Sequence, residues 1–450
     1  MKRTHIRTLA AAAAASCLFS GCMMDIEGVS SGTAAETVEV TTAVTADFSR
    51  EVPEELSADE KNGGKVLKIV SYNDEFKDVF ESLYGVENLP GDVTFEYRII
   101  DRVSTEYSDE LMQEILHGSE PADIVIVEPD YMYDYVNSDI VYPMKELGIG
   151  SKETAEMYPY TLSLGEDTED VLKAVSWQVE PGVFFYRRDI AKAVFGSDDP
   201  EYINTQISDG SWYNTASALS EYGIRILASP EESYRTYRQN SRYAWVDMEG
   251  YIVISEDSRR WAVNSEYEIA NNYIHNYPMW SAEWMHEMSA DGTTFGFYLP
   301  SWGCDGVLIH NAESSGAEWG VCVPDFPYYW GGAFICVPKN TDNADLCGDI
   351  IREVCCDSDK LLAYTEETGD CCNNITALEK FAESNNGYSQ FLRQDPFDVY
   401  CKAAPKITAN YLTGYDAKLD ELYKYAMQDF FTGKCTFEEA EENFIASTQY

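Results

Sequence analysis

Polar side chains that could bind a ligand follow two predicted strands, at residues 66–72 and 122–128. These acidic or amide residues are Asn73, Asp74, Glu75, Glu128 and Asp130. In α/β sheets, ligands bind beyond the carboxyl ends of the strands. An ionised carboxylate accepts several hydrogen bonds at once, which suits a ligand that carries hydroxyl or amine donors. We therefore take these residues as candidate ligand-binding residues.

Two tryptophans end extended segments that continue into glycine. Trp302 lies in segment 299–303, and Trp330 follows Tyr329 in segment 328–332. Glycine lets a ligand approach the main chain, and a tryptophan beside it can present a flat face to a cleft. The same pattern also fits a tryptophan that fills the core beneath a turn, so both interpretations stay open.

Motifs for catalysis or for a cofactor are poorly represented. The histidines after the first 22 residues do not form a His-Glu-x-x-His motif; they are His117, His275, His286 and His310. The sequence contains no P-loop and no Gly-x-Gly-x-x-Gly, so we expect no nucleotide cofactor. Pairs of carboxylates suited to glycoside hydrolysis stay open, because acidic residues are abundant and only their separation decides the chemistry.

Metal binding is also poorly supported. Ten cysteines lie between Cys304 and Cys435, without the paired spacing of a zinc site. We expect them to be mostly reduced, buried thiols. Asn340, Asp342 and Asp345 could contribute oxygen ligands to calcium, but their spacing does not match an EF-hand loop. The sequence therefore predicts no metal site.

The candidate residues near the start belong to a run of alternating strands and helices. Apolar periodicity predicts strands over 66–72, 93–100 and 122–128, with helices over 75–84 and 108–117 between them. This alternation indicates parallel strands with helices on both faces. The last 75 residues are predicted to be helical.

A long extended run at 174–187 is interrupted at Glu180–Gly182. A Pro-Gly pair inside such a run suggests that the chain crosses there from one lobe to another. Glu180 at this crossing is a further candidate binding residue. Trp177, just before it, has the same two interpretations as the other tryptophans.

The first 64 residues direct export rather than folding. Residues 1–21 combine a cationic start with a short apolar stretch and small residues, which is a secretory signal. The ending Ser-Gly-Cys resembles the lipobox of bacterial lipoproteins, in which Cys22 is acylated and becomes the mature N-terminus. A plain secretory signal is the alternative. Residues 22–64 are acidic and aperiodic, which predicts a disordered tether.

A formal net charge of −46 limits the partners. Such a charge repels phosphate backbones and anionic head groups, which excludes nucleic acid as a partner. It is compatible with simple solubility or with attraction of a cationic ligand. We expect only the lipid on Cys22 to hold the protein to the extracellular face of the cell membrane.

Several segments, taken in order, carry a likeness to a known family. They are residues 68–73, 121–125, 141–147, 179–189, 295–302 and 328–332. Together they resemble family 1 of the extracellular solute-binding proteins, the carbohydrate receptors of ABC importers, over about residues 66–446. The family usually has Tyr-Asn-Lys-Asp where this chain has Tyr186, Arg187, Arg188 and Asp189.

The resemblance implies an α/β, two-lobed periplasmic-binding-protein-like fold. Each lobe would have a mostly parallel sheet flanked by helices, with a cleft between the lobes. One lobe would comprise residues 65–178 and about 332–374, and the other would comprise 179–331 and about 375–450. The chain would be a monomer that binds an oligosaccharide by lobe closure, delivers it to ABC permease subunits, and has no enzymatic activity and no cofactor.

The resemblance also assigns roles to single residues. It places Asn73, Asp74 and Glu75 in the ligand loop after the first strand, and Asp130, with Glu128, in the loop after the third. It makes Glu180 an acceptor for sugar hydroxyls and Trp302 a platform beneath a sugar ring. Tyr329 and Trp330 are supported by their motif. Val127 and Tyr131 differ from the residues of maltose-binding protein at these positions, so the particular sugar stays open.

Two other functions are compatible with the residues. A receptor for a polyamine-like cation could use the same tryptophans and acids as a cation cage. A surface glycosidase could use a pair of carboxylates, although the two-lobed α/β pattern fits such an enzyme badly.

Overall fold

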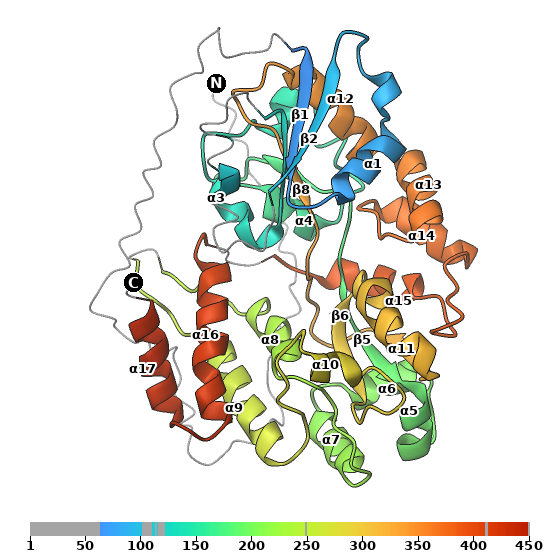
Figure 1. Ribbon diagram of the computed structural model, residues 1–450, viewed down its shortest axis with the longest axis vertical. Helices are drawn as coiled ribbons and strands as arrows, with labels where there is room; N and C mark the ends of the chain where they lie inside the picture. Colours follow the sequence, from blue (N-terminus) through green and yellow to red (C-terminus); the bar gives the residue numbers. More distant parts are fainter. Residues whose placement is uncertain are drawn as a thin grey trace, which may run out of the picture.

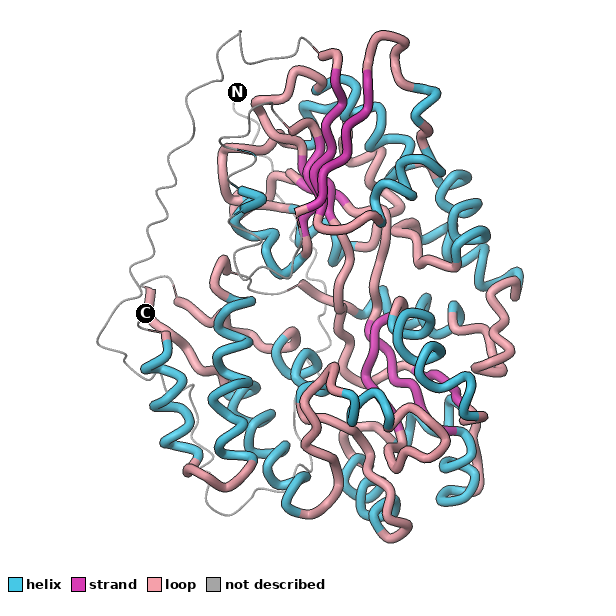
Figure 2. Tube along the Cα trace, viewed as in Figure 1, coloured by secondary structure: helices cyan, strands magenta, loops and turns pink. Residues whose placement is uncertain are grey.

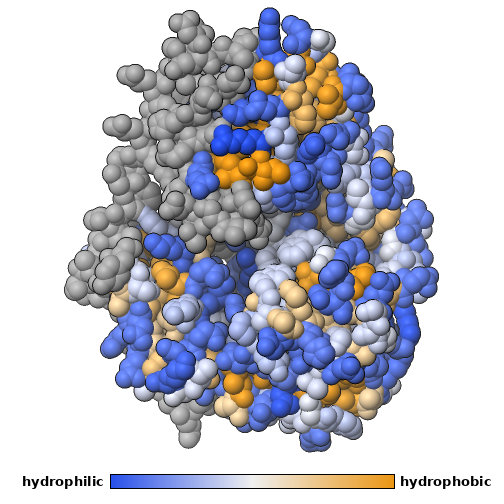
Figure 3. Space-filling model, viewed as in Figure 1, coloured by the Kyte–Doolittle hydropathy of each residue, from blue (hydrophilic) through white to orange (hydrophobic). Residues whose placement is uncertain are grey.

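The computed structural model describes residues 64–100, 110–112, 115, 122–247, 250–409 and 413–448. The predicted signal peptide, Cys22 and nearly all of the tether lie outside the described residues. In the part that is described, no helix is long and apolar enough to cross a membrane. Most of the surface seen in Figure 3 is hydrophilic, in keeping with the strongly acidic composition.

The first sheet has five strands in the order β2-β1-β3-β8-β4, in the upper half of Figure 1. Its strands are β1 (Val66–Ser71), β2 (Thr94–Ile99), β3 (Ile124–Val127), β4 (Ala174–Val175) and β8 (Phe334–Cys336). The first three are parallel, as the sequence predicted, whereas β8 pairs antiparallel with both β3 and β4. The chain therefore returns to the first sheet after a long excursion.

Helices cover this sheet because their apolar residues recur at helical spacing. In α1 (Glu75–Leu83) the buried residues are Phe76, Val79, Phe80 and Leu83. The other helices of this half are α3 (Met132–Val136), α4 (Pro159–Gly165), α12 (Ala344–Ile351) and α13 (Ser358–Thr368); α14 (Ile375–Ser384) packs between α13 and α15. The predicted helix at 108–117 is helical where it is described, but most of it lies outside the described residues.

The second sheet has three strands in the order β6-β5-β7, in the lower half of Figure 1. They are β5 (Gly182–Arg187), β6 (Gly296–Pro300) and β7 (Trp319–Cys322). Both neighbours pair antiparallel with β5, so the expectation of a mostly parallel sheet is wrong for this lobe. Every residue of β5 is buried. A strand that is buried on both faces has a continuous apolar sequence, which is the pattern typical of parallel sheets, so the sequence was misleading here.

Most helices of the second half pack around this sheet or beside it. They are α5 (Arg188–Phe195), α6 (Pro200–Gln206), α7 (Trp212–Ser220), α8 (Glu231–Arg238), α9 (Glu256–Ala270), α10 (Ala282–His286), α11 (His310–Ala312), α15 (Phe397–Ala403), α16 (Asp416–Phe431) and α17 (Phe437–Ser447). Helices α16 and α17 form a layer with α9, whose core includes Trp245, Trp261 and Tyr423.

Extended segments connect the two sheets, as Figure 2 shows. The segment after β4 passes through Glu180 into β5, and Pro181 pairs with Tyr329 of the returning segment. The Trp330 N–H donates to the Glu180 carbonyl at 3.1 Å. Two neighbouring crossings therefore support each other where the sequence predicted a single one.

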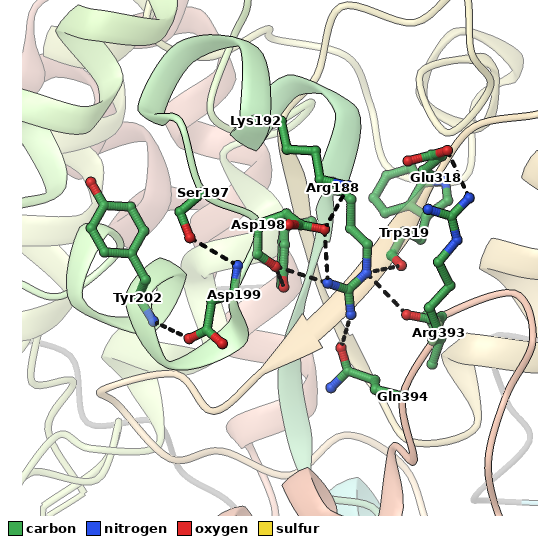
Figure 4. Close-up of polar contacts among 12 residues, drawn as sticks. Arg188, Lys192, Ser197, Asp198, Asp199, Tyr202, Glu318, Trp319, Arg393 and Gln394 are labelled. Atoms are coloured by element: carbon green, nitrogen blue, oxygen red, sulfur yellow. Dashed lines mark hydrogen bonds and ion pairs between the residues drawn. The ribbon is translucent and has the colours of Figure 1, made fainter.

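The two arginines that depart from the family pattern are buried. Figure 4 shows the contacts of Arg188 within the second lobe. The Arg188 guanidinium donates to the carbonyls of Trp319, Leu392 and Asp198 at 2.8, 3.0 and 2.8 Å. It also donates to the Gln394 side chain at 2.5 Å. A lysine could not span these acceptors, because it has three donors on one nitrogen. The departure thus has a structural role.

All ten described cysteines are free thiols. Seven are buried, and Cys356, Cys401 and Cys435 are partly exposed. Burial raises the pKa of the Cys336 thiol to about 12, so it stays protonated at neutral pH. The thiols therefore behave as small apolar core residues, as the sequence led us to expect.

Candidate ligand-binding site

A cleft of about 800 Å³ lies between the two lobes. Its first-lobe side is lined by Tyr72, Asn73, Glu75, Glu128, Pro129, Asp130, Tyr131 and Asp370. Gln178 and Glu180 line it at the crossing. Its second-lobe side is lined by Glu231, Glu232, Tyr234, Arg235, Arg238, Gln239, Met279, Trp280, Trp302, Trp330, Gly331, Gly332, Ala417, Asp420, Glu421 and Lys424.

The loop after β1 places two of its three predicted residues in the cleft. The Asn73 side-chain oxygen accepts a hydrogen bond from the Glu75 N–H at 3.2 Å, which directs the chain into α1. Asn73 and Glu75 line the cleft, whereas Asp74 is exposed and is not among the lining residues. The loop after β3 contributes Glu128 and Asp130, as the strand-end argument predicted.

Three carboxyl groups lie close together on one side of the cleft. Burial raises the pKa of Glu180 well above its ordinary value, and the nearby Glu75 and Asp370 raise it further. Burial and Asp370 likewise raise the pKa of Glu75. Glu180 is only 6% exposed and accepts a hydrogen bond from the Ser301 hydroxyl. A raised pKa favours the neutral carboxyl group, and a neutral carboxyl group can both donate to and accept from a hydroxyl-bearing ligand.

Three tryptophans of the second lobe form an aromatic wall of the cleft; we call Trp280, Trp302 and Trp330 the tryptophan wall. The rings of Trp280 and Trp302 are nearly parallel, at 11°, with centroids 6.4 Å apart. Trp330 meets both rings edge to face, at 5.7 and 5.8 Å. The Trp302 indole N–H donates to the Trp330 carbonyl at 2.9 Å. This bond fixes two rings of the wall relative to each other.

Trp280 was missed by sequence reasoning. It is 45% exposed and has a φ of +66°, which is rare for a bulky residue. Strained backbone conformations cluster at functional sites, where the surrounding structure maintains them. The available signal was a tryptophan in the Tyr-Pro-Met-Trp-Ser turn, next to the Ser281 that caps α10.

Helix α8 supplies two of the three basic residues of the cleft, which sequence reasoning also missed. Arg235 pairs with Asp130 at 3.2 Å, and its Cζ lies 5.3 Å from the centre of the Trp330 ring. Arg238 pairs with Asp416 and Asp420 on the second-lobe side, at 3.3 Å each. Among the described lining residues, nine are acidic and three are basic, so the cleft is acidic.

Besides Asp74, two more of the predicted binding residues do not line the cleft. Trp177 is 1% exposed and packs 5.1 Å from the Phe76 ring. Tyr329 is 3% exposed and stacks on Tyr160, with centroids 5.5 Å apart. Gln239 binds both the N–H and the carbonyl of Tyr329 at 2.9 Å. The prediction that these rings meet a ligand is wrong, because both fill the core behind the cleft wall.

Within the described part of the chain, no group of histidine, cysteine or acidic side chains is arranged to hold a metal ion. Asp342, one of the possible calcium ligands, accepts a hydrogen bond from the Gly64 N–H at 2.7 Å. No histidine lines the cleft, and His117 lies outside the described residues. The site therefore consists of carboxyl, amide, guanidinium and indole groups, which can bind and orient a polar ligand.

The family model of the bacterial extracellular solute-binding proteins matches residues 91–387, about two thirds of the chain. This protein belongs to that family. Its members and its fold serve transport rather than catalysis. A search of curated protein sequences finds no match to this solute-binding protein.

Solved structures confirm the two-lobed α/β fold of this solute-binding protein. An extracellular solute-binding protein of family 1 has a TM-score of 0.73 at 16% identity, over 85% of this chain and 98% of that one. The sugar-binding protein MalE of Xanthomonas citri has a TM-score of 0.67 at 12% identity, over 85% and 96%. The galacto-N-biose- and lacto-N-biose-binding protein of Bifidobacterium longum has a TM-score of 0.64 at 13% identity, over 86% and 96%.

Proposed function

We propose that this protein is the lipid-anchored, extracellular sugar receptor of an ABC importer and that its ligand is an oligosaccharide. The observation that carries the proposal is that the tryptophan wall and the carboxyl groups of Glu75 and Glu180 line the same cleft. Pyranose rings have apolar faces that stack on indoles and a rim of hydroxyls that hydrogen-bond to carboxyl and amide groups. The cleft offers both kinds of surface at once.

Binding would favour the closed arrangement of the lobes, because a ligand contacts both walls only when they approach each other. Asn73, Glu75 and Asp130 act from the first lobe, and the tryptophan wall acts from the second. We infer that the protein has no enzymatic activity and that the sugar is released unaltered. The permease subunits would respond to closure rather than to the sugar itself.

The location and the lobe boundaries form part of the proposal. Acylated Cys22 would hold the protein to the membrane, and residues 22–64 would extend it outwards. The lobes would comprise 65–178 with about 332–374, and 179–331 with about 375–450. The return of β8 to the first sheet supports this division. The protein would act as a monomer.

Calorimetric titration of the purified protein, with Cys22 and its lipid removed, tests the proposal. The panel contains neutral plant and starch oligosaccharides together with lacto-N-biose and β-1,6-galactobiose, which are bound by two similar solved proteins. We expect binding of at least one neutral sugar, which is recovered intact, with an affinity that salt barely changes. If no neutral sugar binds while a cation does, the proposal is wrong.

A receptor for a cationic solute is the second candidate, favoured by the excess of acidic residues among those that line the cleft. An ammonium group could lie over an indole and pair with Glu180 or Asp370. A polyamine panel in the same titration separates the two candidates. Binding to a cation should weaken strongly as ionic strength rises, because screening weakens charge pairs but not stacking.

A further inference from the structure

A second, smaller cavity of about 50 Å³ lies inside the second lobe, behind α8. We call it the α8 pocket. It is bounded by residues of α7, α8 and α9, by Tyr298 of β6 and by the loops before α7 and after β7. Helices α7, α8 and α9 lie together in the lower half of Figure 1. The α8 pocket shares no lining residue with the cleft, so it is a separate feature.

The pocket combines aromatic and acidic side chains. Its aromatic lining residues are Trp212, Tyr213, Tyr237, Tyr298 and Phe326, and its acidic lining residues are Asp209, Asp257, Glu268 and Asp325. Trp212 stacks on Tyr298 with centroids 6.2 Å apart and rings inclined by 25°. Aromatic faces next to carboxylates are the combination that binds ammonium groups in proteins.

Two largely buried side chains of this pocket each have an oxygen without a hydrogen-bond partner among the described residues. Tyr298 is 7% exposed, and its hydroxyl has no hydrogen bond to any described residue. Glu268 is 5% exposed; one of its oxygens accepts from the Trp212 indole N–H at 2.7 Å, and the other has no such partner in the described structure. Both Glu268 and Asp325 act on the pKa of Tyr298, which places its hydroxyl near these acids. A ligand in the cavity could hydrogen-bond to both of these oxygens.

The charges of the residues that line the α8 pocket indicate which kind of ligand it could bind. Burial raises the pKa of Glu268 to about 7, and no cation takes part in that shift. Arg260 lies close enough to Asp209 and Asp257 to affect their pKa values, but it pairs with Glu256 at 3.1 Å, outside the pocket lining. The free oxygen of Glu268 and the Tyr298 hydroxyl can both accept hydrogen bonds, so an occupant that carries donors fits the pocket.

We propose that the α8 pocket binds a small primary ammonium ion, such as methylammonium or the amino end of a short alkylamine. The ammonium group donates to the free oxygen of Glu268 and to the Tyr298 hydroxyl. Its alkyl part lies against Trp212 and Tyr213. Asp209 and Asp325 make the surroundings of the pocket negative, which attracts the cation. This site is independent of the sugar cleft.

Calorimetric titration of the full folded chain with methylammonium and ethylammonium chloride tests the proposal, with methanol and ethanol as neutral probes. We expect saturable binding of the ammonium ions at millimolar concentration and none of the alcohols. Glu268→Gln keeps an acceptor for the Trp212 indole but removes the charge, so it should weaken binding at least tenfold. Tyr298→Phe should weaken it severalfold and leave the melting temperature nearly unchanged, because the hydroxyl has no hydrogen-bond partner among the described residues.

Trp302→Ala in the cleft separates this site from the cationic alternative for the main ligand. Retained ammonium binding in Trp302→Ala, together with its loss in Glu268→Gln, supports the α8 pocket. Binding lost in Trp302→Ala but retained in Glu268→Gln and Tyr298→Phe would place the cation in the cleft and overturn the inference. Absence of binding to the wild-type chain, or equal binding of alcohols and ammonium ions, would overturn it as well.

Discussion

The carboxylate of Asp130 lies 3.2 Å from the guanidinium of Arg235, and this pair joins the two lobes across the cleft. Asp130 follows β3 of the first sheet, whereas Arg235 lies on α8 of the second lobe. The same guanidinium lies over Trp330, with its Cζ 5.3 Å from the ring centre. One arginine therefore connects lobe closure with the position of a ring of the tryptophan wall.

Replacing Arg235 should weaken both lobe closure and the positioning of the Trp330 ring. The Arg235 and Asp130 side chains are 26% and 43% exposed, so the pair is screened by solvent and contributes about 0.5–1 kcal/mol. We expect Arg235→Gln to lower ligand affinity roughly two- to fivefold in a calorimetric titration. Small-angle scattering of the free protein should show a larger radius of gyration, because the closed arrangement loses a bond.

Arg352→Gln is the matched control, since Arg352 pairs with Asp349 on the surface at 2.8 Å, away from the cleft. Its affinity should equal that of the wild type. If both variants bind the ligand as the wild type does, the Asp130–Arg235 pair has no role in closure.

The exposed faces of the tryptophan wall should carry much of the affinity. We expect Trp302→Ala or Trp330→Ala to weaken binding at least tenfold, a loss of about 1.4 kcal/mol. The melting temperature should change little for Trp302→Ala, because that residue is 37% exposed. Tyr222→Ala, at a residue that is 63% exposed outside the cleft, controls for loss of a surface ring. Unchanged affinity in both tryptophan variants would reject the wall as a binding surface.

A different substitution separates binding from stability at Trp280. Its φ of +66° is strained for tryptophan and unstrained for glycine. We therefore expect Trp280→Gly to lower ligand affinity at least tenfold while the melting temperature stays equal or rises. Trp280→Phe, which keeps an aromatic face at the same backbone position, should retain more affinity than Trp280→Gly. A variant that loses stability and keeps its affinity would show that Trp280 only supports the fold.

Local periodicity was sufficient to predict much of the first lobe. Strands β1 and β3 and helix α1 lie where apolar spacing placed them, and the acids at the strand ends reach the cleft because parallel strands end at one edge. The direction of pairing in the second sheet could not be predicted in the same way. The apolar sequence of β5 indicates that the strand is buried on both faces. Antiparallel neighbours bury a strand in the same way, so this sequence does not indicate the direction of pairing.

The remainder of the site depends on contacts between distant parts of the chain. Asp130 and Arg235 are 105 residues apart, and no local pattern pairs them. Trp177 and Trp302 follow similar extended segments, yet one is 1% exposed and the other 37%. Which side of a segment faces solvent is decided by the elements packed on it, such as Phe76 of α1 against Trp177. Sequence spacing does not contain that information.

Asp123 should make stability depend on pH in a specific window. Its side chain is fully buried and accepts hydrogen bonds from the Lys68 N–H at 2.7 Å and from the Thr341 hydroxyl. Burial raises its pKa to about 6. An unfolded chain gives aspartate a pKa of about 3.9, so between these values the folded protein holds a proton that the unfolded chain has released. The stabilisation that protonated Asp123 gives the folded protein is complete below pH ~4 and is lost as pH rises through about 6.

The free energy of unfolding should therefore contain a component that falls by about 3 kcal/mol as pH rises through this window. Other acidic residues titrate in the same range, so the measurement is a difference between wild type and Asp123→Asn in urea titrations across the window. Asn cannot release the proton, and the wild type should lose stability relative to it as pH rises. Asp349→Asn, at a side chain that is 65% exposed, should instead follow the wild-type curve in parallel. A constant difference between wild type and Asp123→Asn would mean that Asp123 is ionised throughout, because its two hydrogen bonds then outweigh its burial.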